Sequence, residues 1–162
     1  MAENTTTLTT FYKGWDVYQH HLITAIAPLT PDQLALRAAA DLRSIGMIAT
    51  HIIGARARWF HHLLGEGGPE IALLAQWDRD NQPIHTASEL VSGLESSWQM
   101  IQNALARWVP SDLERTFQEE WGGEKYTFSL QWVLWHLIEH DLHHGGEISL
   151  TLGMHGLAAP DI

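Results

Sequence analysis

The sequence predicts an all-α protein, a four-helix bundle in up-down-down-up order with a long crossover between its second and third helices. Three observations predict it. Apolar residues recur at three- and four-residue spacing in four separate stretches, which is typical of amphipathic helices. A proline or glycine follows each stretch. The chain has 162 residues, 45% of them hydrophobic, a size that suits one domain covering residues 1–162.

The first two predicted helices cover about 9–26 and 44–65. The first stops before Pro28, because proline cannot continue a helix. The second begins at Ser44, whose side chain is a good helix N-cap, and stops at the glycine that ends its range. Between them, Pro31 favours one short helical turn.

The third and fourth predicted helices cover about 86–109 and 129–152. Thr86, with Glu89 three residues later, forms a capping box, which makes this the clearest helix start in the chain. Gly153 follows the last apolar position of the fourth helix and stops it. Both helices are long enough to run the full length of a small bundle.

The remaining connections differ from each other. Residues 66–85 form a long crossover, in which we expect a short helix around 71–76. Residues 115–128 alternate aromatic and polar side chains around Gly122 and Gly123, a pattern that indicates a small β-hairpin before the fourth helix.

Composition excludes several classes of function. Lysine and arginine total 9 against 19 acidic residues, so the formal net charge is −10. That charge repels phosphate backbones and anionic lipids, which argues against nucleic-acid and membrane partners. Cysteine is absent, which excludes disulfides, thiolate metal sites and cysteine nucleophiles. No leader or membrane-spanning stretch is recognisable, so we expect a soluble, cytoplasmic protein.

Histidines cluster on the fourth predicted helix, at positions 136, 140, 143 and 144. Residues four apart lie one above the other on a helix, so two imidazoles at that spacing can bind one metal ion. A helical wheel turns His140 and His144 most directly toward the bundle interior, and His136 and His143 toward its flank. In one-letter code, residues 140–144 match H-D-x-x-H, a variant of the H-E-x-x-H zinc motif.

We expect a third ligand from upstream, because only 18 residues follow His144 and no glutamate lies among them beyond Glu147. His51, beside the apolar face of the second predicted helix, is the best candidate. Three histidines leave coordination positions open, as in catalytic zinc sites. Imidazole ligands favour zinc or nickel, with manganese and iron as alternatives.

Asp141 falls within the apolar arc of the fourth predicted helix, where an unpaired carboxylate is costly, so we expect a compensating partner. Two roles are open for it. It is either the general base of the site, or a carboxylate that holds a ligand histidine in one tautomer through a hydrogen bond. The second role is the preferred interpretation.

The sequence resembles the DinB-like superfamily of metalloenzymes. The resemblance rests on the histidine within SIGMIATHIIGARARWF and on the family signature H-[ED]-x-H-H-R-G-Q, which reads HDLHHGGE at residues 140–147. It implies a four-helix bundle, commonly a homodimer, that binds a divalent metal through His51, His140 and His144.

Two positions depart from that signature. Gly145 stands where the family usually has arginine, and Glu147 stands where it usually has glutamine. Loss of the guanidinium removes an anion contact. The ligand set that the resemblance implies is intact.

Two classes of function fit these features. In the first, the protein is a metal-dependent enzyme whose ion lowers the pKa of a bound water or low-molecular-weight thiol and presents it to a small-molecule substrate. The superfamily includes thiol-S-transferases that use bacillithiol or mycothiol, and here a thiol would arrive as cosubstrate because the chain has no cysteine. In the second, the protein is a non-catalytic homodimeric binding module with a structural metal or a small-ligand site.

Overall fold

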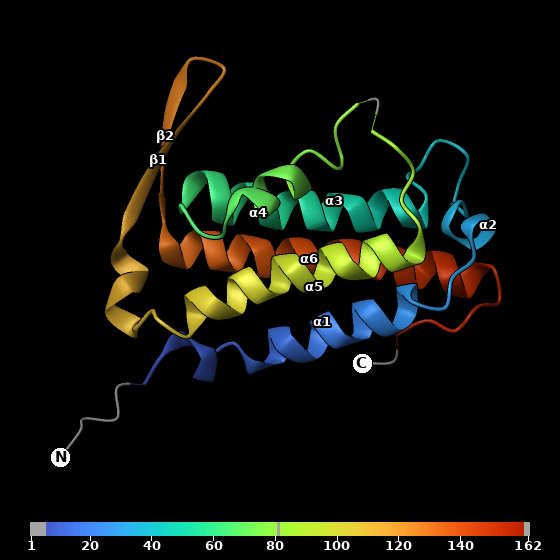
Figure 1. The fold of residues 1–162 in the computed structure, drawn as a ribbon, viewed down its shortest axis with the longest axis horizontal. Helices are drawn as coiled ribbons and strands as arrows, with labels where there is room; N and C mark the ends of the chain where they lie inside the picture. Colours follow the sequence, from blue (N-terminus) through green and yellow to red (C-terminus); the bar gives the residue numbers. More distant parts are fainter. Residues whose placement is uncertain (1–5, 81, 161–162) are drawn as a thin grey trace.

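The computed structural model describes residues 6–80 and 82–160, and it is mostly helical with one small antiparallel sheet. Four long helices lie lengthwise beside one another (Figure 1). They are α1 (Lys13–Ile26), α3 (Ile45–Ala57), α5 (Ala87–Leu105) and α6 (Leu130–Met154). Traced by colour in Figure 1, α1 and α6 run from left to right, whereas α3 and α5 run from right to left.

The connections contain only short elements. They are the 3-10 turns η1 (Leu8–Thr10) and η3 (Pro110–Glu114), the π-helical turn η2 (Arg58–Leu63), the short helices α2 (Pro31–Leu34) and α4 (Pro69–Leu74), and the strands β1 (Thr116–Trp121) and β2 (Glu124–Ser129). The helical turn expected at Pro31 and the short helix expected in the crossover are therefore both present. The expectation that the N-terminus carries no leader concerns residues that lie partly outside the structure, because the described residues begin at position 6.

The predicted N-caps are confirmed at the starts of α3 and α5, whereas α6 runs past the predicted stop at Gly153 and ends at Met154. The hydroxyl of Ser44 accepts from Met47 N at the start of α3, and Thr86 and Glu89 form the expected capping box at the start of α5. The first helix begins at Lys13 rather than at position 9, because a separate 3-10 turn precedes it. In that turn, Leu8 N donates to the carbonyl of Trp108, 2.9 Å away.

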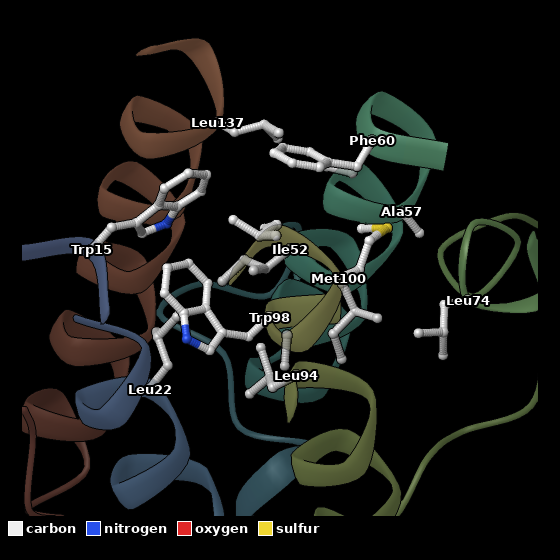
Figure 2. Packing of buried hydrophobic residues seen from close by; sticks show 14 of the residues in the cluster. Trp15, Leu22, Ile52, Ala57, Phe60, Leu74, Leu94, Trp98, Met100 and Leu137 are labelled. Atoms are coloured by element: carbon white, nitrogen blue, oxygen red, sulfur yellow. The ribbon is translucent and has the colours of Figure 1, made fainter. Parts of the chain in front are cut away.

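Helix α3 lies at the centre of the packing. It packs on α5, on α6 and on the short helix α4, so most of its circumference is buried. Figure 2 shows Ile52 of α3 among apolar side chains of the neighbouring helices, including Trp15, Leu94 and Trp98. A helix that is apolar on nearly every side is expected at such a position. Helix α3, whose His51 faces α6, is thus held by its neighbours on several sides.

The predicted hairpin is confirmed. Strands β1 and β2 pair antiparallel, with Phe117 opposite Phe128. Gly122 and Gly123 make the two-residue turn with φ of 60° and 84°, values that glycine adopts without the steric cost of a side chain. The hairpin stands away from the helices in Figure 1, while its base lies against α6 and η2.

No helix within residues 6–80 and 82–160 combines the length and the apolar character that crossing a lipid bilayer demands.

Candidate metal centre

Three histidines from two helices converge on one point. His51 comes from the middle of α3, and His140 and His144 come from successive turns of α6. Each offers a ring nitrogen, and these nitrogens all lie within 4.8 Å of one another. The Nε2 atoms of His51 and His140 are 3.2 Å apart. Two nitrogens bound to one tetrahedral zinc ion at 2.0–2.1 Å would be about 3.3 Å apart, so this pair has the spacing of metal ligands.

Carboxylates contact two of these rings at their Nδ1 atoms. Asp78 Oδ2 lies 2.7 Å from His51 Nδ1, and Glu147 Oε2 lies 2.7 Å from His144 Nδ1. A carboxylate that accepts from Nδ1–H selects the tautomer whose Nε2 carries a free lone pair. His51 and His144 are therefore oriented as Nε2 donors, which is the usual arrangement of a metal-binding histidine with its supporting carboxylate.

Asp78 is itself fixed by an arginine. Arg58 donates from both terminal nitrogens to the two oxygens of Asp78, and also to the carbonyl of Ala75. Burial raises the pKa of the Asp78 carboxyl, but the hydrogen bonds from His51 and Arg58 and the charge of Arg58 outweigh that effect and hold the pKa well below its usual value. Asp78 thus remains ionised and available to His51. Sequence reasoning missed it, because it lies in the crossover and carries no local motif.

The surroundings of His140 and His144, the two candidate ligands on α6, favour the neutral, metal-binding state of each ring. Burial, together with the neighbouring His144, His51, His136 and Arg58, lowers the pKa of His140 to about 3. Burial also lowers the pKa of His144, although its hydrogen bond to Glu147 opposes the shift. The Nδ1 atom of His140 is buried and has no hydrogen-bond partner among the described residues. His140 is therefore the ring that packing alone has to orient.

Asp141 makes no hydrogen bond to a histidine among the described residues. Its carboxylate is fully buried and accepts from Arg56 and from Trp15 Nε1, so its bonds go to α3 and α1 instead of to a histidine. Neighbouring residues on a helix point about 100° apart, which turns Asp141 away from the side that carries His140. The expectation that a partner compensates its charge is met, since Arg56 is also fully buried.

The two departures from the resemblance have different surroundings. Glu147 contacts the site directly through His144, and its side chain is 46% exposed. Gly145 is buried against α1, and a Cβ at this position would collide with the hydroxyl of Tyr18. The ring of Tyr18 therefore occupies the space that a larger residue at position 145 would need.

A row of aromatic rings connects the hairpin to the site. Tyr126, Phe128, Trp132 and His136 stack in succession, with centroids 4.6–6.3 Å apart. Trp59, from the π-helical turn, packs against Phe128, Trp132 and His136, and also against Trp121. The His136 ring lies 6.2 Å from that of His140. The hairpin and the π-helical turn thus close one end of the site.

Two hollows in the described surface lie away from the three histidines. One of about 810 Å³ runs between α1 and α5, and another of about 310 Å³ lies between α1 and α6. None of the three histidines lines either of them. The side chain of His51 is 22% exposed, so this ring is partly open to solvent.

The supporting carboxylates give a first prediction. Asp78→Asn and Glu147→Gln should each weaken zinc binding about 10- to 100-fold, because each replaces the charged acceptor that raises the basicity of a ligand histidine with a neutral amide. Competition with a chromophoric chelator measures the affinity. Glu139→Gln is the matched control, since Glu139 is an exposed glutamate on the same helix with no hydrogen bond to the three histidines. Equal affinities in all three variants would contradict the prediction.

Comparisons with known proteins agree on one family. The model of the DinB family matches residues 1–162. Among solved structures, the chain is similar to a DinB-like protein from Bacillus cereus ATCC 10987, with a TM-score of 0.74, 21% sequence identity, and coverage of 96% of this chain and 97% of that chain. At that identity the likeness shows the fold alone. The curated proteins contain no match.

Proposed function

The chain belongs to the DinB family, and from this premise we propose that it is a metal-dependent enzyme whose His51, His140 and His144 hold a divalent ion. Imidazole ligands favour zinc or nickel, with manganese or iron as alternatives. The premise concerns the fold, and one fold hosts many functions, so the argument for function rests on the site.

One observation carries the proposal. Three imidazoles from α3 and α6 meet, and carboxylates support two of them on the far side. Structural zinc sites generally complete four protein ligands, often with cysteine, whereas three histidines leave room for water or substrate. Among the described residues, no fourth candidate ligand belongs to this group. The donor set therefore fits a catalytic ion better than a structural one.

The ion, when bound, would supply Lewis acidity that lowers the pKa of a water molecule or a low-molecular-weight thiol. The residues of the chain supply orientation and proton transfer. Asp78 and Arg58 hold the His51 ring in place, and Glu147 Oε2 holds that of His144. The partly exposed Glu147 carboxylate, 2.7 Å from His144 Nδ1, is able to take up a proton at the edge of the site. A thiol nucleophile has to be a cosubstrate, because the chain has no cysteine.

The ligand assignment predicts the metal content of variants. His51→Ala and His144→Ala should each abolish stoichiometric metal in elemental analysis and leave helical circular dichroism largely intact, because each removes one of only three ligands. His143→Ala is the control, since that side chain is mostly exposed and lies outside the three-histidine group. Undiminished metal in the two ligand variants would show that the assignment is wrong.

Turnover separates the two chemistries. The protein loaded with zinc, nickel or manganese is assayed with bacillithiol, mycothiol or glutathione plus an electrophile, and separately with ester substrates. Metal-dependent consumption of thiol supports the transferase, and metal-dependent ester cleavage supports the hydrolase. Loss of the same activity in His144→Ala links it to the site.

A second candidate function is a non-catalytic binding module with a structural metal or small ligand. It is favoured by the burial of His144 and by the absence of the histidines from both of the hollows described above. A bound ion that exchanges slowly, with no turnover of any substrate class, would support this alternative.

For both candidate functions we interpret the four long helices as an up-down-down-up bundle that forms one domain, residues 1–162. We also propose that this domain associates as a homodimer.

A further inference from the structure

The outward face of α6 carries an unusual set of residues. Positions 135, 139, 142, 146, 149 and 153 fall within an arc of about 80° when each residue advances ~100° around the helix. Five of these six residues are exposed, and Ser149 is half-buried. His140 and His144 of the candidate metal centre lie on another side of the same helix, turned toward His51 of α3. The outer face is thus separate from the metal centre.

Large and small residues divide this face into two halves. The first half holds Trp135, which is 62% exposed, and Leu142, which is 47% exposed. The second half holds Gly146 and Gly153, and a Cβ added at either would have no heavy atom within 4 Å. The only charged residue on the face is Glu139. Large exposed apolar side chains next to glycines with free space above them form a surface against which a partner can pack.

The spacing of these residues is symmetric about position 144. Trp135 and Gly153 lie nine residues to either side of it, and Leu142 and Gly146 lie two residues to either side. Two copies of α6 packed antiparallel around a two-fold axis at this level would place each tryptophan on a glycine of the partner, and each leucine on the other glycine. Self-complementarity of this kind is the requirement for a two-fold interface.

We propose that the outer face of α6 is the surface through which two copies of this chain associate, with Trp135 of each copy against Gly153 of the other. Charge supports a second copy as the occupant. A chain of net charge −10 repels its like over most of its surface, and this face carries a single charge. An exposed face with a single charge therefore lowers the electrostatic cost of self-association.

The apolar surface continues beyond the helix. Leu142 and Ile138 also line the smaller hollow between α1 and α6, together with Phe11, which is 63% exposed. The aromatic side chains Phe11, Trp132 and Trp135 each expose on the order of 100 Å². They supply over a third of the roughly 800 Å² that a standard interface buries on each partner. Leu142 and the backbone of the glycines add to this area.

Sedimentation velocity of the full chain over a wide concentration range tests the interface. The native chain should sediment as a dimer, and Leu142→Glu should weaken the dimer on the order of 100-fold, because it places two carboxylates in an apolar interface. Val17→Glu is the control, since Val17 is an exposed residue on α1 that lines the other hollow. A monomeric native chain, or a dimer unaffected by Leu142→Glu, would overturn the proposal.

A size exchange tests the pairing itself. Gly153→Trp alone should disrupt the dimer, because two tryptophans would then compete for one space. Adding Trp135→Ala should restore it, because the large and small partners have exchanged places. Failure of the double variant to dimerise would overturn the pairing. Metal content should be unchanged in all these variants, so failure of this proposal is distinguishable from failure of the metal-centre assignment.

Discussion

Replacing Arg56 with methionine should lower the free energy of unfolding by about 3–5 kcal/mol. Arg56 and Asp141 are both fully buried, and Arg56 donates to Asp141 from Nε and Nη2 and to Gln19 from Nη1. Without the guanidinium, the Asp141 carboxylate keeps only the bond from Trp15 Nε1 and becomes a buried charge without a countercharge. Chemical denaturation monitored by circular dichroism measures the loss.

The double variant Arg56→Met, Asp141→Leu provides the control. Removing both charges leaves no uncompensated ion, so the double variant should be clearly more stable than Arg56→Met alone. Equal destabilisation in the single and double variants would show that the loss comes from packing and not from the buried charge.

The same network links the helices that carry the metal centre. Trp15 and Gln19 come from α1, Arg56 from α3 and Asp141 from α6, and Gln19 also donates to the carbonyl of Leu94 in α5. Directional hydrogen bonds resist rotation of one helix against another, which apolar contacts alone do less well. The role of Asp141 is therefore to set how α6 sits against α3, and hence where His140 and His144 lie relative to His51.

Gly145→Arg, which introduces the residue usual in the family signature, should destabilise this protein by about 1–3 kcal/mol or more. A Cβ at position 145 already collides with the Tyr18 hydroxyl, and Leu22 lies close behind. The side chain of arginine needs far more room than a Cβ. The loss in free energy of unfolding is measured by denaturation in the presence of excess chelator, so that metal binding does not contribute to it.

Two further variants test whether the collision with Tyr18 causes the destabilisation by Gly145→Arg. Gly14→Arg, at an exposed glycine of α1 with open space around its Cβ, should have a much smaller effect. Combining Gly145→Arg with Tyr18→Ala should cost less than the sum of the two single changes, because the truncated ring vacates the space. An additive double variant would contradict the assignment of Tyr18 as the obstacle.

Much of the fold could be predicted because its signals are local. The caps at Ser44 and Thr86 and the Gly122–Gly123 turn act within a few residues of themselves, and the structure places helices and a hairpin there. His140 and His144 meet for the same reason, since residues four apart share a helix face. The π-helical turn Arg58–Leu63 carried no such signal and was not predicted.

The supporting parts of the site depend on contacts between distant segments. Asp78 reaches His51 from 27 residues away, and Arg56 reaches Asp141 across 85 residues. The sequence indicated that Asp141 needs a partner but not which residue provides it. Nothing in the spacing of residues 66–85 distinguishes Asp78 from the other acidic residues of the crossover.

The sequence by itself determined the helices, the hairpin and the pair of histidines on α6, because periodicity, capping and turn formation are interactions between near neighbours. Only the tertiary structure decided how α3 and α6 face each other, which carboxylates support which imidazoles, and that Tyr18 occupies the space beside Gly145. Those choices depend on how buried charges and side-chain volumes are accommodated between helices, and that is settled when the whole chain packs.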